Sequence, residues 1–255
     1  MSERCAIPAD PRWLRPDWPA PATVCAVTTT RRGGVSARPF DAFNLATHVG
    51  DEPQAVAANR RALAAALGLP AEPVWLEQVH GAGVVDAART QGMSAADASV
   101  ALGPRAVCVV QTADCLPVLF CSRRGDRVGA AHAGWRGLAG GVLEATVAAL
   151  DVDPGELLAW LGPAIGPAAF EVGDEVRAAF LADDAGSADC FSVNPRGRWQ
   201  ADIFALARRR LARLGLREVH GGGLCTYTDA ARFYSYRRDR DTGRMASLIW
   251  ISTPA

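Results

Sequence analysis

"VCVVQTADCLPVLFCSRRGDRVGAAH", residues 107–132, contains three short apolar runs separated by a few polar or glycine residues. The runs cover 107–112, 117–121 and 127–132, and such short apolar runs bounded by turn residues are typical of buried strands. Cys115 lies just before the second run and His132 ends the third. Because scaffolds usually present chemistry where strands give way to turns, this stretch predicts a sheet with a functional site at its edge.

The rest of the chain alternates similar runs with Ala-rich helical stretches, which predicts an α/β or α+β fold. Further strands are expected over 23–30, 74–79, 157–161 and 247–251, and helices over 53–67, 138–150, 174–182 and 200–214. Asp51 and Pro53 are typical of a helix start, and Gly68 and Gly215 of helix ends. Residues 181–190 are expected to form an irregular surface excursion.

The domain organisation follows from the absence of a Ser/Gly linker or charge block in the sequence. We expect residues 23–255 to form a single catalytic domain. The Pro-rich residues 1–22 are expected to form an extended N-terminal arm that wraps around it.

The charge composition excludes several function classes. The 27 basic and 27 acidic residues balance to a net charge of zero, and every basic residue is Arg. Without Lys the chain cannot form a P-loop, a Schiff-base lysine or a Ser-Lys dyad. A zero net charge provides no overall attraction to nucleic acid or anionic membrane, so we expect small-molecule partners, with no nucleic acid and no membrane. The N-terminus lacks the apolar core of a signal peptide, which predicts a cytoplasmic protein.

Cysteine usage also favours an intracellular protein. The chain has seven cysteines, and Cys25, Cys108, Cys115 and Cys121 lie in or beside strand-like runs. We expect most of them to be small core residues in a reducing compartment rather than a disulfide framework.

The four histidines are His48, His80, His132 and His220, and three of them lie in Gly-flanked turns after apolar runs. This placement predicts imidazoles along one rim of a sheet. With Cys115, His80 and His132 make a donor set suited to catalytic zinc, because three protein ligands leave the fourth tetrahedral position open. Such a site polarises an oxygen or generates a nucleophilic hydroxide.

Other interpretations of the same residues stay open. Cys115 and His132 can form a nucleophile and its base, with Asp114 orienting one of them. Two His and one Cys also suit a blue-copper centre. However, four histidines are few for a multicopper oxidase, and apart from the initiator only Met93 and Met245 could supply an axial methionine ligand. A fourth protein ligand, such as His48 or another cysteine, would instead indicate a non-enzymatic protein with structural zinc.

Arginines are the candidate anion-binding residues, since a guanidinium beside a metal suits phosphate or carboxylate. Arg136 lies four residues after His132 in a Gly-rich turn, and Arg60 lies in the expected helix 53–67. Glu171, which follows the rigid turn "GPAIGP", is expected to line a pocket or to cap a helix.

The combination of "RRGGVSARPFDAFNLATHVGDEP", "EQVHG", "TADCLPVLF", "HAGWRGLAGGV", "GPAIGPAAFEVGDEV" and "FYSYRRDRDTGR" resembles the YfiH/PgeF family, the peptidoglycan-editing-factor and purine-nucleoside-phosphorylase group formerly labelled polyphenol oxidase or laccase-domain proteins. The resemblance runs in order from about residue 28 to 251. It implies a single-domain α/β sandwich with a CNF/YfiH-like, cysteine-hydrolase-type fold and mixed sheets flanked by helices. It also implies a zinc ion bound by His80, Cys115 and His132.

The resemblance further implies phosphorolysis of adenosine, inosine and methylthioadenosine to the base and ribose-1-phosphate, together with deamination of adenosine. On this basis we expect Arg60 and Arg136 to bind phosphate, Asn44 and His48 to contact sugar or base, and Asp114 to support a metal ligand. The peptidoglycan-editing name implies an alternative, a Cys-His amidase that removes a wrong serine from a UDP-muramyl precursor.

Overall fold

The computed structural model describes residues 5 and 7–252 of the chain. The strands are β1 (Trp13–Leu14), β2 (Val24–Thr29), β3 (Leu76–Glu77), β4 (Val84–Asp86), β5 (Ser94–Ala95), β6 (Ala98–Ala101), β7 (Val107–Thr112), β8 (Leu116–Ser122), β9 (Val128–Ala133), β10 (Leu157–Leu161), β11 (Glu171–Val172), β12 (Phe191–Val193), β13 (Trp199–Ala201), β14 (Glu218–Gly221) and β15 (Met245–Ile251). The α-helices are α1 (Pro53–Leu67), α2 (Trp135–Ala139), α3 (Val142–Ala149), α4 (Asp174–Leu181), α5 (Ile203–Arg213) and α6 (Tyr236–Asp239).

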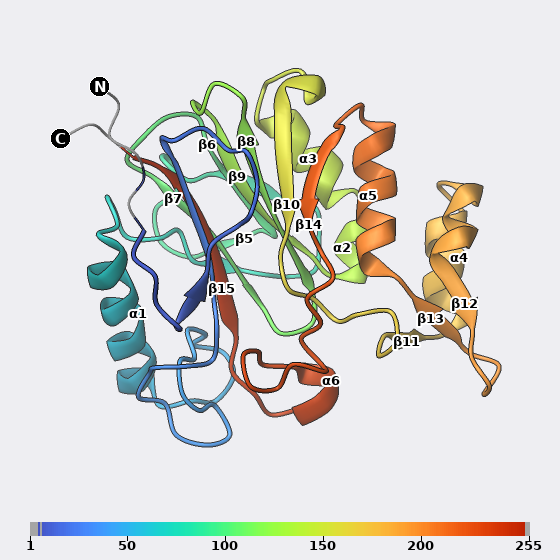
Figure 1. Ribbon diagram of the computed structural model, residues 1–255, viewed down its shortest axis with the longest axis horizontal. Coiled ribbons are helices and arrows are strands. Elements are labelled where there is room, and N and C mark those ends of the chain that lie inside the picture. Colours follow the sequence, from blue (N-terminus) through green and yellow to red (C-terminus); the bar gives the residue numbers. More distant parts are fainter. Residues whose placement is uncertain (1–4, 6, 253–255) are drawn as a thin grey trace.

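Two sheets face each other and helices cover their outer faces (Figure 1). One sheet has the order β1-β2-β15-β7 and the other the order β14-β10-β8-β9-β6-β4. Helix α1 packs on the outer face of the first sheet, and α3 and α5 pack on the outer face of the second. Because β4–β6 and β10–β14 are parallel pairs among antiparallel neighbours, the larger sheet is mixed. The predicted α/β sandwich with mixed sheets flanked by helices is confirmed.

Burial of both faces explains why the strands appear as continuous apolar runs. In β7, Val107 and Val109 belong to the core under α1, whereas Cys108 and Val110 belong to the core between the sheets. Side chains of a strand alternate between its two faces. When both faces are buried, the alternation of polar and apolar residues is lost. In the sequence, a buried strand can then be distinguished from a buried helix only by the length of the apolar run and by flanking Gly or Pro.

Several predicted boundaries move for identifiable reasons. The predicted helix 138–150 is split into α2 and α3, because Gly141 adopts a φ of 93°, which side-chain-bearing residues rarely adopt. The predicted helix 200–214 begins at Ile203, where the Asp202 carboxylate accepts a hydrogen bond from the Ala205 N–H. Of the predicted strand 74–79, Leu76–Glu77 pairs with β5, and Val74 forms an isolated bridge with Cys108. No helix in the described part of the chain is long and apolar enough to span a membrane.

A smaller sheet, β11-β13-β12, projects with α4 beyond the main sheets (Figure 1). The segment 181–190, predicted as an irregular excursion, contains a 3-10 helix over Ala185–Cys190. Its Asp184 caps this helix by accepting a hydrogen bond from the Gly186 N–H. This lobe is continuous with the core, since Phe180 and Phe191 are buried in the same cluster as α3 and α5.

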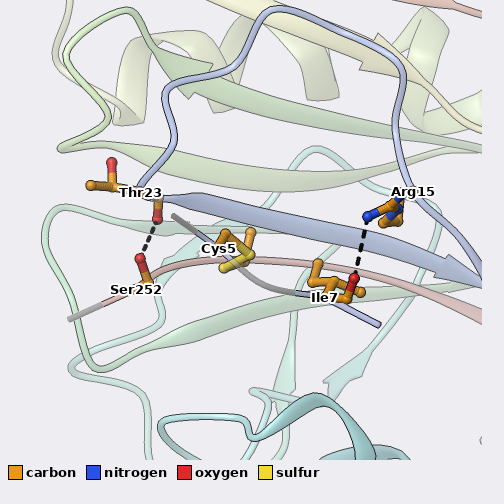
Figure 2. Close-up of a disulfide and its surroundings, with 6 residues drawn as sticks. Cys5, Ile7, Arg15, Thr23 and Ser252 are labelled. Atoms are coloured by element: carbon orange, nitrogen blue, oxygen red, sulfur yellow. Dashed lines mark hydrogen bonds between the residues drawn. A yellow bond between two sulfur atoms is a disulfide. The ribbon is translucent and has the colours of Figure 1, made fainter. Parts of the chain in front are cut away.

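The N-terminal segment returns along the first sheet and is cross-linked to it (Figure 2). Trp13–Leu14 pairs with Thr28–Thr29 as an edge strand. Cys25, expected as a reduced core residue, instead forms a disulfide with Cys5; the Cα atoms lie 5.5 Å apart, within the usual range for a disulfide. The pairing arises because the Cys5 N–H donates to the Ala22 carbonyl, which places the two cysteines side by side. The division into an arm over 1–22 and a single domain over 23–255 stays a prediction.

A substitution at Phe120 tests how much the packing of the second sheet contributes to the free energy of unfolding. Its side chain is fully buried between β8 and the covering helices. We expect Phe120→Ala to lower the free energy of unfolding by about 3–5 kcal/mol, because it leaves a cavity in a packed core. Val35→Ala, at a side chain that is 66% exposed, should change it by less than about 0.5 kcal/mol. Urea titrations followed by fluorescence provide the comparison, and equal effects would contradict the packing described.

Candidate metal centre

Three neighbouring strands bring Asp97, Cys115 and His132 together at one end of the second sheet. In the β8–β9 register Pro117 lies opposite His132, and Cys115 immediately precedes β8. In the β6–β9 register Ala98 lies opposite Ala131, and the His132 N–H donates to the Asp97 carbonyl. The antiparallel pairing therefore places the thiol and the carboxyl on the two sides of the imidazole.

The buried Asp97 carboxylate holds the loop that carries His80. It accepts the backbone N–H groups of Val79, His80 and Gly81 at 3.2, 3.0 and 2.6 Å. These bonds fix His80 at a φ of 59°, a left-handed conformation that histidine adopts more readily than most residues. The same carboxylate faces His132 Nδ1 at 2.8 Å. One fully buried carboxylate thus positions both imidazoles.

The three donor side chains fit a tetrahedral metal ion. One ligand atom from each of His80, Cys115 and His132 lies within 4.8 Å of the other two. The space between them depends on Gly134, since a Cβ there would lie 2.7 Å from His80 Nδ1 and 2.9 Å from Cys115 Sγ. His132 Nδ1 is taken by Asp97, so its Nε2 is the nitrogen available to a metal, an arrangement common for histidine ligands. Among the described residues three such donors gather, which leaves a fourth position open.

The electrostatics of the set favour a thiolate. Burial alone would raise the pKa of Cys115, but the charge and hydrogen bonds of His132 and His80 lower it to about 6. Burial alone would lower the pKa of His132, but Cys115 and Asp97 raise it to about 9. Without a metal at neutral pH, Cys115 is therefore a thiolate and His132 an imidazolium.

The donor set lies at a cavity of about 460 Å³. Its walls combine the donor residues with apolar, amide, aromatic and guanidinium side chains. The residues that line it are His48, Gln78, His80, Gln111, Thr112, Ala113, Asp114, Cys115, His132, Trp135, Arg136, Ile165, Phe170, Ile203, Tyr236, Arg237 and Arg244. This volume suits a small molecule.

The cavity is cationic. Arg136, Arg237 and Arg244 line it, and none of their guanidinium groups pairs with a carboxylate of the described residues. Arg237 donates to the Glu171 carbonyl, and Arg136 stacks on Trp135. The arrangement can bind an anion beside a metal.

Of the predicted substrate contacts, His48 and Arg136 line the cavity. Asp114, predicted to support a metal ligand, also lines the cavity, and both of its carboxylate oxygens accept hydrogen bonds. One Asp114 oxygen accepts from the Thr226 hydroxyl and the other from the Arg237 N–H, each at 2.6 Å. Asp114 therefore fixes the start of α6 beside the cavity, while Asp97 supports His132. His220 lies apart in β14 and faces Glu218.

The other three predicted contacts do not line the cavity. Arg60 donates to the Leu45 carbonyl and stacks on Trp75, with its guanidinium carbon 3.7 Å from the ring centroid. Asn44 is fully buried, and its Oδ1 accepts the Arg244 N–H at 2.9 Å. The Glu171 carboxylate pairs with Arg196 and Arg198 on the smaller lobe. A direct substrate contact by these three side chains stays a prediction.

Asp97 and Arg244 are site residues that sequence reasoning missed. Asp97 lies among small residues in "SAADASVALG", and its only signal was a carboxylate directly before a fully buried strand. Arg244 ends "DTGR" just before β15. Its pKa is lowered by burial, a sign that the group is withdrawn from water.

Comparison with known proteins assigns the family. The family described as multi-copper polyphenol oxidoreductase laccase matches residues 25–252. The chain belongs to this laccase family. A Pseudomonas aeruginosa protein named purine nucleoside phosphorylase PA4543 is 59% identical over 94% of this chain and 98% of its own length. Escherichia coli purine nucleoside phosphorylase YfiH is 54% identical over 92% of this chain and 97% of its own length.

Solved structures of similar proteins share the fold. Neisseria meningitidis protein NMB0706 superposes with a TM-score of 0.92 at 51% identity, over 95% of this chain and all of that one. YlmD from Geobacillus stearothermophilus gives a TM-score of 0.87 at 29% identity, over 98% of this chain and 100% of that one. The predicted resemblance to YfiH proteins is confirmed.

The family's copper description can be compared with the donor set. A blue-copper centre adds a weak axial ligand, often Met, to two His and one Cys. Met93 is 59% exposed, and the Met245 sulfur accepts the Tyr234 N–H in a separate core cluster. Neither methionine lines the cavity. Met93 and Met245 therefore do not supply the axial ligand of a blue-copper centre.

Metal uptake should depend on pH in a defined direction. Binding requires neutral His132, whose pKa is raised to about 9, and thiolate Cys115, whose pKa is lowered to about 6. Between these values one proton leaves per metal bound, so the apparent zinc affinity of the metal-free protein should rise about tenfold per pH unit. Competition with a chromophoric chelator from pH 6 to 9, corrected for the chelator's own protonation, measures the slope. A flat profile would contradict the protonation states described.

Substitutions at Asp97 and Gly134 test whether these two residues are needed for zinc binding by the donor set. Asp97→Asn should weaken zinc binding about 10–100-fold, the usual effect of removing a carboxylate that orients a histidine ligand. Gly134→Ala should lower zinc content because its methyl group occupies the space between His80 and Cys115. Gly103→Ala, where a Cβ meets nothing within 4 Å, is the control. Full zinc content in both site variants would contradict this geometry.

Proposed function

We propose that the protein is a zinc-dependent purine nucleoside phosphorylase that converts adenosine, inosine or methylthioadenosine and phosphate to the base and ribose-1-phosphate. The observation that carries the proposal is the open His80, Cys115, His132 set at a cavity whose guanidinium groups have no carboxylate partner among the described residues. The names of the Pseudomonas aeruginosa and Escherichia coli relatives support the same reaction. The proposal includes adenosine deamination as a second activity, and the cytoplasm as the compartment in which the protein acts.

The protein's side chains divide the work between the two substrates. Phosphorolysis needs an oxyanion held beside the anomeric carbon while positive charge develops on the sugar. The cavity arginines bind and orient that anion. Phe170, Ile165 and Ile203 provide an apolar wall for the purine, and Tyr236 adds an aromatic face.

Zinc, when bound, supplies a Lewis acid that polarises an oxygen and activates water. Asp97 keeps a proton on His132 Nδ1 and so leaves Nε2 free as a ligand. The Cys115 thiolate balances part of the metal charge. The apolar wall limits water around the base and thereby favours phosphate over hydrolysis.

A second function is favoured by one specific observation: His132 lies between the Cys115 thiol and the Asp97 carboxylate. This is the arrangement of a nucleophile, a base and an orienting carboxylate, and it requires no metal. The editing amidase acting on a serine-bearing UDP-muramyl precursor would use the low pKa of Cys115. The carboxylate in this role would be Asp97 in place of Asp114, because Asp97 faces His132.

The phosphorylase proposal predicts that base release from adenosine requires both phosphate and metal. Cys115→Ala should lose zinc and lower kcat/KM at least about 100-fold, because the metal is then missing its thiolate ligand. Chromatographic assay of adenine and ribose-1-phosphate, with zinc content measured on the same samples, provides the test. Zinc-loaded wild type that leaves adenosine untouched would contradict the proposal.

Chelation separates the two functions. Wild type stripped of metal should lose phosphorolysis and regain it on addition of zinc. A thiolate amidase would keep its activity after stripping and lose it on alkylation of Cys115. Release of serine from a muramyl precursor by metal-free protein would favour the amidase.

A further inference from the structure

One buried hydroxyl in the cavity has no hydrogen-bond partner. The Thr112 side chain is 1% exposed, lines the cavity, and its Oγ1 bonds to no atom of the described residues. A buried polar atom left without a partner costs free energy, so such atoms are rare unless a ligand or water satisfies them. The hydroxyl is therefore positioned to bond a ligand in the cavity.

The side chain of Arg244 enters the cavity from the neighbouring strand. Thr112 lies opposite Met245 in the β7–β15 register, and Arg244 is the residue before it. Arg244 Nη1 donates to the carbonyls of Thr242 and Gly243, at 2.7 and 3.0 Å, which fixes the guanidinium in place. The other guanidinium N–H groups of Arg244 form no hydrogen bond with the described residues, and the guanidinium has no carboxylate partner within ion-pair distance among them.

The position of this pair differs from that of the apolar wall. Thr112 lies in β7 and Arg244 directly precedes β15, both in the sheet β1-β2-β15-β7, whereas Phe170, Ile165 and Ile203 belong to the core on the helical side of the other sheet. Cys115 and His132 lie at the ends of β8 and β9 in that other sheet. The Thr112–Arg244 pair and the apolar wall therefore line the cavity from different sheets, while Arg237 lies beside Phe170 of that wall.

We propose that the Thr112 hydroxyl and the Arg244 guanidinium form the subsite that binds the inorganic phosphate co-substrate. This rests on the proposed phosphorylase function and assigns one part of its cavity. The hydroxyl donates to one phosphate oxygen and the guanidinium to others, which satisfies the unpartnered oxygen and neutralises the buried cation together. Arg60 stacks on Trp75 outside the cavity lining, so the proposed subsite does not include it.

Thr112→Val tests the subsite because it removes the hydroxyl and keeps a β-branched side chain in a strand. Loss of one hydrogen bond to a charged ligand should raise the KM for phosphate about tenfold or more. The KM for adenosine and the zinc content should stay within about twofold of wild type. Thr112→Ser should restore most of the phosphate affinity. Thr146→Val, at a fully buried threonine of α3 outside the cavity, is the matched control and should change none of these values.

Two further outcomes are distinguishable. If Thr112→Val raises the KM for adenosine and leaves that for phosphate unchanged, the hydroxyl binds the nucleoside and the phosphate subsite is overturned. If wild type does not cleave adenosine, the phosphorylase function fails, and calorimetric titration of inorganic phosphate into the zinc-loaded protein decides the subsite by itself. Binding weakened at least tenfold in Thr112→Val supports it, and equal binding or no binding to wild type overturns it.

Discussion

The carboxylate of Asp97 is the constraint on which the site depends. It is fully buried, and it accepts hydrogen bonds from three successive backbone N–H groups and faces His132 Nδ1. A buried charge is tolerated only when it is well paired. By satisfying that requirement, Asp97 holds a loop between short strands against the end of a sheet, and so joins His80 to two residues whose positions the sheet already sets.

The sheet contributes the rest of the geometry through register. Cys115 and His132 are separated by a hairpin in the sequence but lie on adjacent strands, because β8 and β9 pair directly. Gly134 then permits the approach of His80 and Cys115, since any side chain at that position would fill the space between them. Packing on both faces of the strands keeps these positions rigid, as a metal or nucleophile site requires.

Sequence reasoning predicted what depends on local pattern and missed what depends on distant contacts. Strands such as Val107–Thr112 and the helix Pro53–Leu67 carried clear periodicity and punctuation and were predicted with their correct limits. The roles of Asp97 and Arg244 depend on partners far away in the chain, which no local pattern reveals. The Cys5–Cys25 cross-link was missed for the same reason, because it arises from the return of the N-terminal segment along β2. The donor set was found because His80, Cys115 and His132 each lie at a strand end or in a glycine-flanked turn.

We expect His80, Cys115 and His132 to hold one zinc ion with a fourth position open to the cavity. The most direct test is anomalous diffraction at the zinc edge from crystals of the zinc-loaded protein. A single strong peak is expected about 2.0–2.3 Å from the three donor atoms, with a fourth ligand that is not a protein atom. Absence of metal from the three donors, or a fourth protein ligand that closes the site, would contradict an open zinc centre.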